Sequence, residues 1–155
     1  MRIVLSCLVL FFIASSKAQT PPSLSTKQQQ KTVEASKLQE ISYKRQSRQG
    51  NSLITFSPKK IVIYSSTKKS ESLNIPKKEW DSIQYLVSKI AISQLLDLKA
   101  PTDKRLYDGA ASATLTIVKD KKSWVSSPFD DGYPPTEISK LIYKLLSLEE
   151  GLLKN

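Results

Sequence analysis

Two short acidic stretches contain the side chains best suited to chemistry. Asp108 precedes Gly109, and Asp130 and Asp131 precede Gly132. Carboxylates that converge at one end of a sheet can form an acid–base pair or, with carbonyl oxygens, bind Ca²⁺ through about six to eight ligands. Asp108, Asp130 and Asp131 are therefore the candidate ligand-binding, metal-binding or acid–base residues.

The same pattern also has a purely structural interpretation. Neither stretch has the spaced D-x-D-x-D-G pattern of a calcium loop. Asp followed by Gly is a common turn pair, because the carboxylate accepts hydrogen bonds from nearby backbone N–H groups. We therefore favour turns over a metal or acid–base site, and predict no bound metal or cofactor.

Other reactive side chains are scarce. The chain has one cysteine, Cys7, and no histidine. Cys7 falls in an N-terminal segment that we expect to be removed. The remaining chain then has no thiol nucleophile, no disulfide, no histidine base and no cysteine or histidine ligand for zinc.

Residues 1–18 have the pattern of a secretory signal peptide. Arg2 is followed by the apolar run Ile3–Ala14, and the small residues Ser16 and Ala18 precede a predicted cleavage site before Gln19. The apolar run is shorter than the roughly 20 residues of a membrane-spanning helix. We therefore expect an exported protein, periplasmic or secreted, with no transmembrane span in the mature chain.

The composition changes after the signal peptide and again near residue 38. Residues 19–37 are rich in Gln, Ser, Thr, Lys and Pro, which predicts a disordered linker. From residue 38 to 155, regular apolar patterns predict a single domain.

Lysine dominates the charge of the chain. Removing Arg2 and Lys17 with the signal peptide lowers the formal net charge from +10 to +8. This balance favours an acidic partner, either an acidic envelope polymer or an acidic protein, and no signature of a nucleic-acid-binding module is present. Several lysines occur as neighbours in predicted turns, where they also protect sheet edges from aggregation: Lys59/Lys60, Lys68/Lys69, Lys77/Lys78 and Lys121/Lys122. The first and third of these pairs are predicted to share one end of the sheet.

Two segments have the apolar periodicity of amphipathic helices. In Pro76–Leu96, proline suits the first turn, and Glu79 suits the positive end of the helix dipole. Its apolar residues fall on one broad face: Trp80, Ile83, Leu86, Val87, Ile90, Ala91 and Leu95. A second helix is predicted over Pro135–Glu150, with Gly151 as its stop.

The opposite face of the first predicted helix is partly apolar as well. It would present Tyr85, Lys89, Ile92 and Leu96. An exposed aromatic residue beside aliphatic residues and a lysine is typical of a protein interface, although single exposed apolar residues are also common. We therefore predict a partner-binding surface at these four residues.

Short β-prone runs separated by turn signals surround the first helix. Those before it are Leu38–Gln46, Leu53–Phe56, Ile61–Tyr64 and a less regular Ser70–Leu73. Those after it are Ala111–Val118 and Ser123–Ser126, joined by the four-residue turn Lys119–Lys122, which sets Trp124 opposite Ile117. The sequence thus predicts an α+β two-layer sandwich, with elements in the order β-β-β(-β)-α-β-β-α and both helices on one face of an antiparallel sheet.

The second half of the domain resembles small, mostly uncharacterised proteins exported by bacteria. The resemblance rests on the tryptophan-led helix, on Tyr107-Asp108-Gly109-Ala110, and on the stretch from Phe129 to Pro135. It covers residues 41–148 and implies a single fold unit with no established activity.

Three functions remain open. The leading hypothesis is an exported, non-catalytic binding domain, because His, Cys and a catalytic triad signature are absent. One alternative is a carboxylate-dependent hydrolase that uses Asp108, Asp130 or Asp131, which requires carboxylates about 5–10 Å apart. Another is a structural envelope protein that binds an anionic polymer through its lysines.

Overall fold

A computed structural model describes residues 37–154, except for the side chain of Leu152. The predicted signal peptide and all but the last residue of the predicted linker lie outside the described residues. Within this range, no helix has the length and apolar character needed to cross a membrane.

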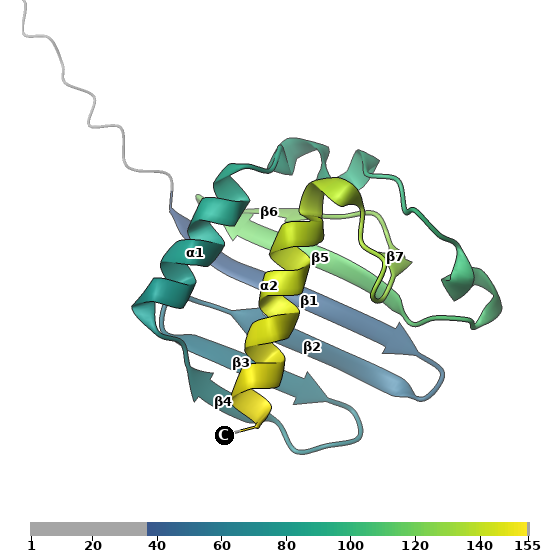
Figure 1. The fold of residues 1–155 in the computed structure, drawn as a ribbon, viewed down its shortest axis with the longest axis horizontal. Coiled ribbons are helices and arrows are strands. Elements are labelled where there is room, and N and C mark those ends of the chain that lie inside the picture. Colours follow the sequence, from purple (N-terminus) through teal and green to yellow (C-terminus); the bar gives the residue numbers. More distant parts are fainter. Residues whose placement is uncertain (1–36, 155) are drawn as a thin grey trace, which may run out of the picture. The chain divides into compact units, whose positions relative to one another are not determined.

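The centre of the fold is an antiparallel sheet of six strands in the order β4-β3-β2-β1-β5-β6 (Figure 1). A seventh, two-residue strand pairs with the first residues of β5. The strands are β1 Leu38–Ser47, β2 Gly50–Phe56, β3 Lys60–Ser65, β4 Glu71–Asn74, β5 Ser112–Lys119, β6 Lys122–Val125 and β7 Phe129–Asp130.

The first strand of the sequence lies in the middle of the sheet. Ile41 pairs with Phe56 of β2 on one side and with Ile117 of β5 on the other. Alternate residues of β1, including Ile41 and Tyr43, are fully buried on one face, as strand periodicity requires.

Two helices cover that face side by side (Figure 1). They are α1 Lys77–Ser88 and α2 Thr136–Leu153. Trp80, Ile83 and Val87 of α1 and Ile138, Leu141, Ile142 and Leu145 of α2 are buried in one core with the sheet residues. The α+β two-layer fold predicted from the sequence is confirmed.

The first helix is shorter than predicted. It ends at Ser88 instead of Leu96, and a 3-10 helix, η1 Ile92–Asp97, follows after a bend at Ile90. The Ser88 hydroxyl donates to the Tyr85 carbonyl at 2.7 Å, and the bend carries Leu95 into the core, where it is 1% exposed. Leu95 is therefore buried, as the apolar periodicity predicts, but from a separate 3-10 helix.

The β5–β6 hairpin is tighter than predicted. Only Asp120 and Lys121 separate the strands, and both have positive φ angles, of 51° and 62°. Two consecutive left-handed residues form the turn that matches the twist of a hairpin. The predicted pairing of Ile117 with Trp124 is confirmed.

The outer edge of β5 is shared between β6 and β7. Between them, the buried Ser126 donates its backbone N–H to the Leu115 carbonyl at 2.8 Å, and its Oγ accepts from the Leu115 N–H at 3.0 Å. The strand β7 and a second 3-10 helix, η2 Lys104–Tyr107, were not predicted. Together these two elements position the acidic residues.

Candidate functional site

Asp130 is fully buried and forms the anchor of the η2 segment. Its Oδ2 accepts from Thr102 Oγ1 at 2.5 Å and from the Lys104 backbone N–H at 2.7 Å. Its Oδ1 accepts from the Arg105 backbone N–H at 2.9 Å and from Arg105 Nη1 at 3.1 Å. Both oxygens are therefore occupied by donors from one loop.

These donors also determine the protonation state of Asp130. Burial alone would raise the pKa of its carboxyl group, but the hydrogen bonds from Thr102, Arg105 and Lys104 outweigh burial and lower the pKa to about 2. A carboxylate that is ionised at neutral pH and has no free oxygen cannot serve as a proton donor there. Asp130 therefore has a structural role.

Asp131 points into a different environment. Its Oδ1 accepts a 2.6 Å hydrogen bond from the hydroxyl of Tyr43, whose side chain is fully buried in β1. Burial, together with the hydrogen bond to Asp131 and its negative charge, raises the pKa of the Tyr43 hydroxyl. The neutral phenol and the carboxylate thus form a stable pair.

Arg45, two residues further along β1, extends this polar network. Its Nη2 lies 2.6 Å from Glu149 Oε1 on α2, its Nε donates to Ser52 Oγ at 2.9 Å, and its guanidinium lies 5.7 Å from the centre of the Tyr43 ring. The side chains of Arg45 and Glu149 are only 24% and 12% exposed. The pair therefore ties α2 to the central strand.

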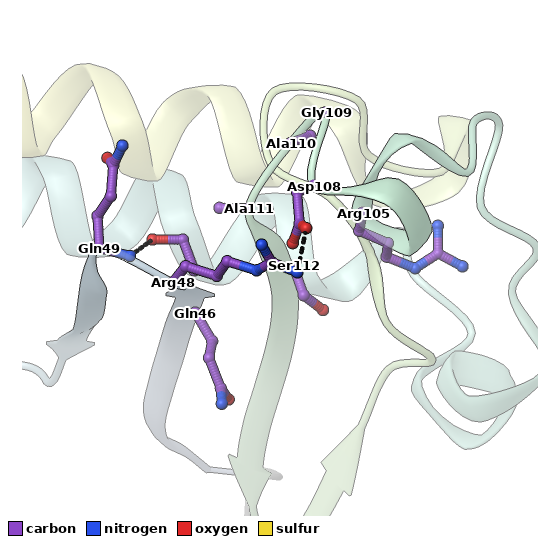
Figure 2. Close-up of a pocket in the computed structure, with 10 residues that line it drawn as sticks. Gln46, Arg48, Gln49, Arg105, Asp108, Gly109, Ala110, Ala111 and Ser112 are labelled. Carbon is purple, nitrogen blue, oxygen red and sulfur yellow. Dashed lines mark hydrogen bonds and ion pairs between the residues drawn. The ribbon is translucent and has the colours of Figure 1, made fainter.

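Asp108, the third candidate, lies on the surface. It caps η2 with a left-handed backbone and pairs with Arg48 at 2.7 Å across an open cavity, as Figure 2 shows. The side chains of Arg48 and Asp108 are 84% and 54% exposed. Arg105, also in the cavity wall, points away from this pair (Figure 2).

The three aspartates do not form one acidic site. Asp130 faces η2, Asp131 faces Tyr43, and Asp108 faces Arg48. Among residues 37–154, no group of three or more Asp or Glu side chains is arranged to hold a metal ion. The geometry favours the turn-building role of these residues over an acid–base or metal site.

The predicted partner surface is divided by the bend after α1. Tyr85 and Lys89 are neighbours, with Lys89 Nζ 5.0 Å from the centre of the Tyr85 ring. Leu96 is 69% exposed on η1, whereas Ile92 is half-buried and packs against the core. The four residues therefore do not share one helix face.

The structure instead gathers lysines at one end of the sheet. Antiparallel pairing places the beginnings of β1, β3 and β6 and the end of β5 at this end, and α1 begins there as well (Figure 1). We call it the lysine-rich end, defined by Lys37, Lys59, Lys60, Lys77, Lys78, Lys119, Lys121 and Lys122. It holds three of the four lysine pairs, while Lys68 and Lys69 lie in the β3–β4 turn at the opposite end.

Few carboxylates neutralise this end. Asp81 pairs with Lys77 at 2.6 Å, and Asp120 accepts a hydrogen bond from the backbone N–H of Lys37 at 2.7 Å. Within the described part of the chain, no ion pair involves Lys59, Lys60, Lys78, Lys121 or Lys122. A cavity of about 630 Å³ lies beside Lys59 and Lys77 and is floored by Ile75 and Trp80.

Sequence reasoning missed the network of Tyr43, Arg45 and Glu149 as a structural unit. A signal was present, because Arg45 occupies a core-facing position of an alternating strand. It also missed that Lys121 and Lys122 join the other two pairs. That grouping depends on β5 pairing with β1, which the sequence pattern alone does not specify.

Comparison of the chain with protein-family models, with curated proteins and with solved structures found no match. The resemblance to small exported bacterial proteins therefore stays a prediction.

Proposed function

We propose that this protein is an exported, non-catalytic binding domain that holds an extended acidic polymer through its lysine-rich end. The observation that carries the proposal is the gathering of three lysine pairs at one end of the sheet with few carboxylates to neutralise them. The formal net charge, +8 once Arg2 and Lys17 are removed with the predicted signal peptide, points in the same direction.

The shape of the lysine-rich end favours an extended polymer over a small anion. Its lysines are distributed from β3 across β1 and β5 to β6, and neighbouring strands lie about 4.8 Å apart. The row therefore extends over roughly 20 Å. A repeating polyanion can contact many of these lysines at once, whereas one small anion contacts two or three.

The proposal also accounts for the absence of a catalytic constellation among the aspartates. Asp130 and Asp131 stabilise loops, and the hydroxyl of Tyr43 is committed to Asp131. An acidic envelope polymer fits the export signal predicted from the sequence.

The test is a comparison of two charge-matched double variants of the full chain. Lys59→Gln/Lys60→Gln removes two charges from the lysine-rich end, and Lys68→Gln/Lys69→Gln removes two charges from the opposite end. Binding to polygalacturonate, a polycarboxylate, and to polyphosphate is measured by fluorescence anisotropy of the labelled polymer. We expect the first variant to bind at least about fivefold more weakly, whereas the second binds like the wild type.

Salt provides the second readout. Binding through exposed lysines should weaken steeply between about 50 and 200 mM NaCl, because ions screen exposed charges beyond about 10 Å. Equal weakening by both double variants, or affinity that does not change with salt, would refute the proposal. Preference for one polymer identifies carboxylate or phosphate as the recognised group.

A further inference from the structure

A polar groove lies at the end of the sheet opposite the lysine-rich end. Its main cavity, of about 780 Å³, lies between the β1–β2 turn and the segment Asp108–Ser112 (Figure 2). Gln46, Arg48 and Gln49 form one wall. Ala110 and Ala111 contribute small apolar surfaces to the other.

The cavity continues toward the helices. A second cavity of about 240 Å³ shares Gln46, Ser47, Gln49 and Ala111 with the first. A third, of about 360 Å³, shares Arg45 and Asp131 with the second and reaches Glu149 on α2. Because neighbouring cavities share lining residues, the three lie in a row from the β1–β2 turn toward α2, and we call this row the polar groove. Such a row suits a chain-like ligand.

The charges of this groove are already matched internally. Arg48 pairs with Asp108 at 2.7 Å and Arg45 pairs with Glu149 at 2.6 Å, while Asp131 accepts the hydroxyl of Tyr43. A charged ligand would have to displace one of these partners. The groove therefore differs from the lysine-rich end, whose lysines are largely unpaired.

Uncharged hydrogen-bonding groups remain free along the groove. No hydrogen bond within residues 37–154 involves the side-chain amides of Gln46, Gln49 or Asn51. In Figure 2, the amides of Gln46 and Gln49 extend to opposite sides of the Arg48–Asp108 pair. Each amide offers two donors and an acceptor, which matches ligand hydroxyl groups.

We propose that this groove binds a neutral oligosaccharide. Its hydroxyl groups would contact the free amides of Gln46, Gln49 and Asn51, and the C–H faces of its rings would lie against Ala110 and Ala111. An extended peptide is less well matched, because the main cavity is lined by polar side chains and by the small residues Ala110 and Ala111, not by large apolar side chains. The inference does not depend on polyanion binding, which involves the other end of the sheet.

The experiment titrates the ¹⁵N-labelled full chain with maltotetraose, cellotetraose and chitotetraose, and with tetragalacturonate as an acidic counterpart. We expect at least one neutral tetrasaccharide to shift the side-chain amide signals of Gln46 and Gln49 in a saturable manner. The variants Gln46→Ala and Gln49→Ala should each raise the Kd about two- to tenfold, the factor expected for one neutral hydrogen bond.

Gln94→Ala is the matched control, because Gln94 is an exposed glutamine on η1, outside the groove. It should leave the Kd unchanged. No saturable shift with any neutral tetrasaccharide up to about 10 mM would overturn the proposal, since even a site with a Kd of 1 mM would then be filled. Tighter binding of tetragalacturonate in the groove, or shifts confined to the lysine-rich end, would also overturn it.

Discussion

Thr102 donates a 2.5 Å hydrogen bond to the buried carboxylate of Asp130, which joins the loop before η2 to the two-residue strand β7. Three further bonds from Lys104 and Arg105 reach the same carboxylate. The carboxylate of Asp130 therefore accepts all four of these hydrogen bonds from the loop that precedes β5. Asp130 accordingly organises one wall of the polar groove without entering it.

Replacing Asp130 by asparagine should destabilise the domain by about 3 kcal/mol. The new amide NH₂ would face N–H or O–H donors and leave at least one of them unsatisfied. Urea unfolding followed by circular dichroism measures the loss. Asp108→Asn, at an exposed ion pair, is the control and should change the free energy of unfolding by no more than about 1 kcal/mol.

The contribution of Asp130 to the free energy of unfolding should also depend on pH. Its pKa is lowered from 3.8 to about 2 on folding, so its stabilisation is fully present above pH 4 and is lost as the pH falls through 2. The free-energy difference between the wild type and Asp130→Asn should therefore shrink by about 2 kcal/mol between pH 5 and pH 2. A constant difference over this range would contradict the assignment.

Tyr43→Phe should reveal the opposite dependence at alkaline pH. The folded pKa of Tyr43 is raised, so its contribution is present below the unfolded value of about 10 and is lost as the pH rises above it. The wild type should lose more stability than Tyr43→Phe between about pH 8 and pH 11. Tyr143→Phe, which removes an exposed hydroxyl, should behave like the wild type in chemical denaturation at each pH.

Glu149→Gln should destabilise the domain by about 2–3 kcal/mol, because Arg45 would keep its charge in a largely buried position without a carboxylate partner. Thermal unfolding at neutral pH reports the change. The matched variant Asp81→Asn breaks the exposed pair with Lys77 and should change stability by less than about 0.5 kcal/mol. A similar loss of stability in both variants would show that the Arg45–Glu149 pair stabilises the domain no more than an exposed ion pair does.

Lys121→Gly should stabilise the β5–β6 hairpin by about 0.5–1 kcal/mol. Lys121 has a φ of 62°, and glycine adopts this conformation without the strain of a Cβ atom. Lys121→Gln removes the same charge but keeps the Cβ atom, and should not raise the melting temperature. A higher melting temperature in both variants would indicate that relief of charge repulsion at the lysine-rich end, and not relief of backbone strain, causes the stabilisation.

The fold class and the pairing of Ile117 with Trp124 followed from local patterns, because alternation in β1 and periodicity in α2 agree with the tertiary structure. The predicted stop of the second helix at Gly151 was wrong, since α2 continues to Leu153. The end of α1 did not follow. Leu95 is buried, as its place on the apolar face predicts, but it belongs to η1 and not to a continuous helix. The two-residue turn at Asp120 and Lys121 was also missed, because neither residue is the glycine that usually marks such turns.

The candidate site was less predictable than the fold. Asp108, Asp130 and Asp131 stand out in the sequence as candidate residues, but their separation depends on which donors each carboxylate meets. Thr102 and Tyr43, which supply two of these donors, are 28 and 88 residues away from their acceptors. Such long-range contacts leave no local pattern in the sequence.

The central position of β1 has a consequence for chains that end before β5. Its second edge is paired only by β5, which begins at Ser112. A fragment truncated before that residue would present a long bare edge of hydrogen-bonding groups and the uncovered Ile41 and Tyr43, features that promote strand-to-strand aggregation. Products of premature termination should therefore precipitate or be degraded. Only a chain that includes β5 can pair both edges of β1.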